Sequence, residues 1–180
     1  MYRARSNPQI VLKPQDLVVL LRLALVTNAV PTYAALAAEL GLTASEVHAG
    51  LERASAAQLA RKDQAGKPSL VREALKLFVI HGARYSFPAV HGELTRGTPT
   101  GYAAPPLNEK IVQPNEAPPV WPHKNGKVRG VAFYPLYPTV PEAAARNQAL
   151  YELLALFDAV RGGSARERAL AIDLLSERLG

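Results

Sequence analysis

The sequence predicts a mainly α-helical fold with a short β-hairpin, a proline-rich arm and a C-terminal helical hairpin. Three observations lead to this prediction. Apolar residues recur with helical spacing over residues 14–81 and again over residues 139–180. Eleven of the 15 prolines lie between Pro88 and Pro141, which excludes long regular helices from that region. Hydrophobic residues make up 48% of the 180-residue chain, which is enough to form a core.

Four helices are predicted in the N-terminal half. The first begins at Pro14, because proline is favoured at the first helical position, and runs to about residue 26. The second and third are expected over residues 32–40 and 43–59. The fourth begins at Pro68 and runs to about residue 81, with its apolar side chains on one side.

The proline-rich region predicts short extended segments. Residues 83–87 are expected to form a strand, and residues 98–103 a second strand beside it. The Asn125-Gly126 pair predicts a further hairpin with a two-residue turn. Large aromatic side chains are costly to leave in water, so we expect those of this region to pack on a domain. They are Tyr102, Trp121, Phe133, Tyr134 and Tyr137.

Residues 139–180 predict two helices joined by Gly162-Gly163. Thr139 and Glu142 have the spacing of a capping box at the start of the first helix. Ser164 and Glu167 have the same spacing at the start of the second. Apolar side chains follow each cap at helical intervals, so the two helices are expected to pack against each other.

Residues 33–51, YAALAAELGLTASEVHAGL, carry the one informative motif. Ala37 suits a point where two helices cross closely, and Gly41 suits a turn with positive φ. Val47 and Leu51 then fall on the inward side of a second helix. Thr43 and Glu46 form a capping box at its start. This spacing is that of a helix-turn-helix.

The motif resembles the helix-turn-helix of bacterial winged-helix transcription regulators of the MarR-like type. The resemblance implies that the second helix enters the major groove of double-stranded DNA and that a dimer reads two half-sites. It also implies a winged-helix-like domain over residues 1–104, which a proline-rich arm (105–138) and a C-terminal helical hairpin (139–180) follow. The hairpin is expected either to form a dimer interface, as the terminal helices of many MarR-like regulators do, or to close the core of a monomer. The DNA-binding residues implied on the helix are Thr43, Ser45, His48, Ala49 and Arg53.

Basic residues after this helix are expected to neutralise phosphates. Arg61, Lys62 and Lys67 follow it directly. Because the segment from Pro68 is predicted to be helical, the wing is expected either over residues 84–104 or not at all. Arg84 and Arg96 are the wing contacts that the first arrangement implies.

The positive charge of the chain is concentrated in this half. The formal net charge is +6, and residues 1–84 hold 11 basic and six acidic residues. Residues 85–140 hold five and three, whereas residues 141–180 hold five and six. A basic N-terminal half fits a DNA-binding face, and a nearly neutral C-terminal segment fits a part of the chain that self-associates.

Several other classes of protein are disfavoured. The absence of cysteine excludes disulfides and thiolate zinc sites, and the four histidines have no metal-ligand spacing. Phosphate-loop and hydrolase motifs are missing, so we predict neither enzyme activity nor a cofactor. The apolar run over residues 17–26 is too short to span a membrane, and a cytoplasmic location is expected.

The sequence therefore predicts a sequence-specific transcriptional regulator, more specifically a repressor. Two alternatives remain open. In the first, the chain is a protein-interaction module, such as an antitoxin or an adaptor of a partner enzyme, that holds its partner through the proline-rich arm. In the second, it is a regulator with a ligand pocket between its two halves.

Overall fold

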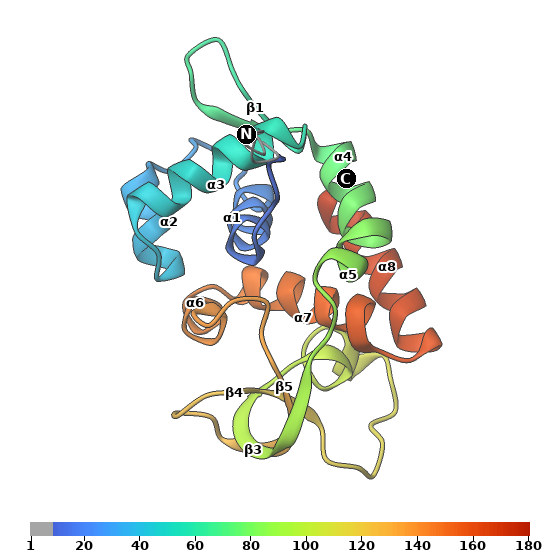
Figure 1. The fold of residues 1–180 in the computed structure, drawn as a ribbon. Helices are drawn as coiled ribbons and strands as arrows, with labels where there is room; N and C mark the ends of the chain where they lie inside the picture. The colour runs from blue at the N-terminus through green and yellow to red at the C-terminus, as the bar shows by residue number, and fades with distance from the viewer. Residues whose placement is uncertain (1–8) are drawn as a thin grey trace, which may run out of the picture.

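The computed structural model describes residues 9–180, and Figure 1 shows their arrangement. The α-helices are α1 (Pro14–Ala24), α2 (Tyr33–Leu40), α3 (Ala44–Ala56), α4 (Arg72–Leu77), α5 (Ala83–Ser86), α6 (Val140–Arg146), α7 (Gln148–Gly162) and α8 (Ala165–Leu179). A π-helical turn, Phe78–Gly82, joins α4 to α5, and 3-10 turns lie at Gly101–Ala103 and Leu107–Glu109. The fold is mainly α-helical with a smaller β part, as predicted.

The strands form two separate sheets. They are β1 (Ala60–Lys62), β2 (Pro68–Leu70), β3 (His91–Pro99), β4 (Pro119–Pro122) and β5 (Val128–Phe133). β1 and β2 make an antiparallel hairpin in which Arg61 faces Ser69. β3 pairs antiparallel with β4 and β5, and these two run parallel to each other, which closes a small barrel. Figure 1 shows the β1–β2 hairpin at one end of the molecule and the barrel at the other.

Helix α7 lies at the centre of the fold. All its residues from Leu153 to Arg161 are buried, because α1, α5, α6 and α8 contact it from different sides. One cluster of buried apolar side chains extends from Leu17 of α1 to Leu179 of α8, so the N- and C-terminal helices share a core. No helix in the described part of the chain is long and apolar enough to cross a membrane.

The barrel is joined to α7 by a buried polar network around Asp158. Its carboxylate accepts hydrogen bonds from Thr100 Oγ1 at 2.7 Å, Trp121 Nε1 at 2.5 Å and Arg161 Nε at 2.8 Å. Arg161 also donates from Nη2 to the carbonyl of Tyr134 at 2.8 Å. Burial raises the pKa of the Asp158 carboxyl, while Arg161 and the hydrogen bonds act in the opposite direction. This network fixes the barrel relative to the helical core.

Tyr151 of α7 makes a second contact with the barrel. Its hydroxyl donates to the carbonyl oxygen of Pro99 at 2.7 Å, and its ring packs edge-on against Trp121, with the centroids 5.6 Å apart. Burial raises the pKa of Tyr151 to about 12, so the hydroxyl keeps its proton at neutral pH. The end of β3 is therefore held at two points on α7.

Several predicted elements differ from the observed ones. Residues 68–70 form β2 rather than the first turn of a helix, and α4 begins only at Arg72. The strand predicted over residues 83–87 is wrong, because Ala83 and Phe87 lie one helical turn apart and both enter the core. The strand predicted over residues 98–103 is also wrong, since β3 ends at Pro99 and a 3-10 turn follows.

The hairpin predicted at Asn125-Gly126 is wrong in its pairing. The segments on either side of this turn, β4 and β5, do not form an antiparallel pair with each other. The antiparallel partner of both strands is β3. The loop that connects β4 to β5 therefore has to pass over β3. A turn signal alone cannot distinguish these arrangements, because the partner strand lies about 30 residues earlier in the sequence.

The C-terminal helices follow the prediction in part. Ser164 and Glu167 form the expected capping box at the start of α8, which packs along α7. The capping box predicted at Thr139 is wrong, because its side chain makes no cap hydrogen bond. Asn147 interrupts the predicted long helix and caps α7 by accepting from the Leu150 amide at 3.0 Å.

The barrel crosses the boundary predicted at residue 104. β3 belongs to the predicted DNA-binding domain (residues 1–104, of which 1–8 lie outside the described residues), whereas β4 and β5 belong to the predicted arm. Trp121 and Phe133 are buried within the fold, as expected for aromatic residues that pack on a domain. Tyr134 is the exception, with 50% of its surface exposed. Residues 105–138 are therefore part of the folded body.

Replacing Asp158 with Asn should strongly destabilise the protein. The change leaves the Arg161 guanidinium buried without a counter-charge, which we expect to cost about 3–5 kcal/mol of the free energy of unfolding. Urea denaturation followed by circular dichroism measures this loss. The control is Asp173→Asn, an exposed position on α8, where a change within about 0.5 kcal/mol is expected. Equal losses in the two variants would contradict the role given to the network.

Candidate functional site

The segment with the informative motif folds into two helices joined by a tight turn. Gly41 ends α2 with φ at 67° and ψ at 35°, the left-handed conformation that glycine adopts without steric cost. The Thr43 hydroxyl accepts from the Glu46 amide at 3.2 Å, and the Glu46 carboxylate accepts from the Thr43 amide at 2.7 Å. The Thr43 backbone hydrogen bond lowers the pKa of Glu46. The predicted capping box is thus confirmed.

The inward positions of the motif are those that the spacing predicts. Ala37, Val47 and Leu51 are all at most 5% exposed, and Leu36 and Leu40 are fully buried beside them. α1 packs behind α3. The other side of α3 is thereby left facing away from the core.

A buried ion pair fixes α3 on α1. Asp16 is 1% exposed, and its two carboxylate oxygens accept from Arg53 Nε and Nη2, each at 2.7 Å. The carboxylate also accepts from the Lys13 amide at 2.9 Å and caps α1. This two-pronged hydrogen bond raises the pKa of Arg53. Arg53, which the resemblance places near the phosphates, is therefore engaged inside the protein and serves to position α3.

The exposed side of α3 carries most of the predicted base contacts. Thr43, Ser45 and His48 are exposed, and Ala49 is half-buried. The His48 ring lies against the Tyr33 ring with centroids 5.6 Å apart, and its Nε2 is 3.8 Å from Glu52 Oε1. The structure therefore brings these predicted residues together on one accessible face, which is short of positive charge.

A β-hairpin directly follows α3, at a place where the sequence analysis does not expect one. β1 and β2 flank a turn in which the Asp63 carboxylate accepts from the amides of Ala65 at 2.9 Å and Lys67 at 2.8 Å. Residues 84–104, where one of the two predicted arrangements has a wing, form no hairpin and contain α5, β3 and a 3-10 turn. Pro68, which is predicted to begin a helix, begins a strand, and the signal that could have revealed the turn is Asp63 followed by Gly66.

The three cations after α3 all lie on this hairpin and are exposed. Lys62 Nζ forms an ion pair with Glu52 Oε1 of α3 at 2.7 Å. That contact lowers the pKa of Glu52 and raises the pKa of Lys62. Arg61 and Lys67 form no ion pair among residues 9–180. The hairpin therefore supplies two cations, Arg61 and Lys67, that have no ion-pair partner within residues 9–180.

Arg84 and Arg96 do not belong to this hairpin. Arg84 lies on α5, where its guanidinium sits 5.1 Å from the centre of the Tyr85 ring. Arg96 lies on β3 in the barrel. The placement of both residues on one hairpin is therefore wrong, because α5 contacts α7 whereas β3 pairs with β4 and β5.

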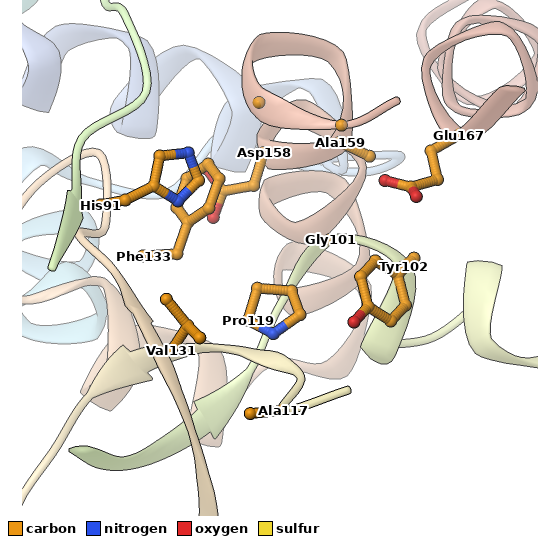
Figure 2. A pocket seen from close by; sticks show the side chains of 12 residues that line it. His91, Gly101, Tyr102, Ala117, Pro119, Val131, Phe133, Asp158, Ala159 and Glu167 are labelled. Atoms are coloured by element: carbon orange, nitrogen blue, oxygen red, sulfur yellow. The ribbon is translucent and has the colours of Figure 1, made fainter. Parts of the chain in front are cut away.

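A pocket of about 150 Å³ lies between the barrel and the start of α8 (Figure 2). Its walls are mostly apolar, with the rings of Tyr102 and Phe133 on different sides and Glu167 at its edge. The Glu167 carboxylate is already used to cap α8. The Asp158 carboxylate is held by its three donors. The pocket therefore offers little polar chemistry that would select a ligand.

Comparison with protein-family models, curated proteins and solved structures finds no match to this chain. Within residues 9–180, no group of three or more histidine, aspartate or glutamate side chains is arranged to hold a metal ion. The arrangement of α2, α3 and the β1–β2 hairpin is therefore the candidate functional site, and its function is argued from its own geometry.

Replacing Arg53 with Ala should lower the stability of the protein, because Arg53 holds α3 in place inside the fold. The change leaves the Asp16 carboxylate buried without its partner, and we expect a loss near 3 kcal/mol, the low end for a buried pair, because Arg53 is partly hydrated. Thermal and urea unfolding measure the loss. Arg61→Ala is the matched control on the exposed hairpin and should change stability by less than about 0.5 kcal/mol. A wild-type stability for Arg53→Ala would show that the pair does not anchor α3.

Proposed function

We propose that this protein binds double-stranded DNA through α3 and the β1–β2 hairpin, as a winged-helix protein does. The observation that carries the proposal is the sequence of elements α2, tight turn, α3 and antiparallel hairpin, with the polar side of α3 left uncovered. In such an arrangement the second helix enters the major groove and its N-terminal, outward residues meet base edges. Here those residues are Thr43, Ser45 and His48.

The attraction to phosphates would come from the hairpin more than from α3. The only cation on α3 is Arg53, and its guanidinium is bound to Asp16. Arg61 and Lys67 project from the hairpin without an ion-pair partner in the described chain, and Lys62 could exchange Glu52 for a phosphate. Cations that neutralise phosphates release counterions, so binding should weaken as the salt concentration rises.

The proposed biological role is transcriptional regulation by repression. A protein that occupies DNA through α3 blocks access to the same base pairs, and repression needs no further activity. Two copies would read two half-sites about one helical turn apart, since a two-fold dimer matches a palindromic site. The homodimer and the repressor role belong to the proposal together with DNA binding.

One observation favours a second candidate, a protein-interaction module. Glu52 lies near the middle of the exposed side of α3, where a carboxylate would face the phosphates of bound DNA. The Lys62 ammonium neutralises it, which leaves the face nearly uncharged. An uncharged polar face suits a protein partner better than a polyanion. The binding experiment below distinguishes the two candidates.

Replacing Arg61 and Lys67 together with Ala should weaken DNA binding of every sequence to a similar extent. If each cation neutralises one phosphate, the slope of log K against log salt should become shallower by about 1.8, or 0.9 per phosphate. Fluorescence anisotropy with a labelled duplex of random sequence measures this slope. The matched control, Lys110→Ala with Arg166→Ala, removes two exposed cations from other elements and should leave the slope unchanged. Failure of the unmodified protein to bind duplex DNA at low salt would overturn the proposal.

Replacing Ser45 or His48 with Ala should instead change base preference. A lost contact to a base edge is worth about 1–3 kcal/mol of discrimination at one position of the site. Selection of duplexes from a randomised pool, with the unmodified protein and with each variant, measures that preference. The slope of log K against log salt should be the same in both variants as in the unmodified protein. Unaltered preference in both would place the reading surface elsewhere than on α3.

A further inference from the structure

The barrel carries a second group of positive charges, at the end opposite the β1–β2 hairpin. We call it the barrel-tip surface. It consists of Arg96 on β3, Lys124 and Lys127 in the loop between β4 and β5, and Arg129 on β5. All four residues are exposed. Figure 1 shows this part of the molecule separated from α3 and the hairpin by α1 and α7.

Two of these cations face each other across the sheet. Arg96 and Arg129 are direct partners in the antiparallel pairing of β3 with β5, so their side chains start from the same side of the sheet. Like charges directly opposite each other destabilise a strand pair. An anion that binds between or across the two guanidinium groups would relieve this repulsion.

The loop that holds Lys124 and Lys127 is fixed against the same strand. A Cβ atom on Gly126 would overlap the backbone of Gly97, and one on Gly97 would overlap the carbonyl of Trp121. The His123 amide also donates to the Arg96 carbonyl oxygen at 3.2 Å. Backbone packed this closely holds the loop in place, so the backbone segments that carry the four cations lie close together without any ligand.

Among residues 9–180, none of these four side chains takes part in an ion pair or a side-chain hydrogen bond. Glu142 lies nearby on α6 but faces His123, with 3.4 Å between Oε1 and Nε2. Glu93, the acidic residue on β3, lies at the bulge between His91 and Leu94. Arginines of the core, such as Arg53 and Arg161, are by contrast fully engaged.

We propose that the barrel-tip surface binds the phosphate backbone of nucleic acid, as a contact separate from α3 and its hairpin. The composition favours a polyanion over an acidic protein, because lysine is depleted in protein–protein interfaces but is a regular phosphate ligand. The proposal extends the proposed function to a second stretch of DNA, yet it rests on different residues. Two phosphate contacts at opposite ends of one chain would raise the affinity for long DNA over that for either contact alone.

The test compares three variants of the full chain by fluorescence anisotropy with a long random-sequence duplex. The first is Arg96→Ala with Arg129→Ala, and the second is Lys124→Ala with Lys127→Ala, which leaves the paired strand residues untouched. The third is the hairpin variant, Arg61→Ala with Lys67→Ala. If each cation neutralises one phosphate, each double variant should reduce the salt slope by about 1.8. Combining the first and third should reduce it by the sum. Thermal unfolding checks that each variant is folded.

The outcomes separate this proposal from the proposed function. A shallower slope in both barrel variants but not in the hairpin variant would support the barrel-tip surface and overturn binding through the hairpin. A shallower slope only in the hairpin variant would overturn the barrel-tip surface. Weaker binding with an unchanged slope in the barrel variants would also overturn it. Polyglutamate is the probe for an acidic protein partner. If the barrel variants bind DNA as the unmodified protein does but lose binding to polyglutamate, the surface is assigned to an acidic protein and the proposal is overturned.

Discussion

The buried carboxylate of Asp158 is the constraint on which the arrangement of this protein depends. It lies on α7, the helix that α1, α5, α6 and α8 contact, and it receives donors from β4, from Thr100 directly after β3 and from its own helix. A carboxylate in such a place is stable only if all these donors are present, because an unpaired buried charge costs several kcal/mol. The barrel therefore has one position on α7. At the other end of the molecule, the buried Asp16 carboxylate likewise needs its partner Arg53, and this ion pair fixes α3 on α1.

The candidate site also contacts the C-terminal helices directly, because α2 packs against α6. Arg146 of α6 donates to the carbonyl oxygens of Ala38 at 3.0 Å and Glu39 at 3.4 Å, which satisfies groups at the end of α2. The side chain of Thr139, at the start of α6, lies close to Gly41. A Cβ atom added to Gly41 would be 3.2 Å from it. The turn before α3 is thus supported by residues about 100 positions later in the chain, which couples the exposed face of α3 to the C-terminal half.

Much of the helical framework could be predicted because its signals are local. Pro14, Gly41, the Thr43–Glu46 pair and the Ser164–Glu167 pair each act within one turn of helix, and each lies where its spacing indicates. The β elements could not be predicted in the same way. Pro68 is equally suited to a helix start and to a short edge strand, and only pairing with Lys62 decides between them. The partners of β3 lie about 30 residues away, and no local pattern identifies them.

The sequence by itself determined α1, α2, α3 and α8, the caps at Gly41, Thr43 and Ser164, the inward face of the α2–α3 pair and the excess of positive charge, because these properties depend on residue type and short spacing. Only the tertiary structure decided what each charge does. Arg53 looks available on a helix, yet a carboxylate 37 positions earlier occupies it. Arg96 looks like a wing residue, yet strand pairing places it opposite Arg129. A charge is free or engaged according to the groups that folding brings within about 4 Å of it, and those contacts join distant parts of the chain.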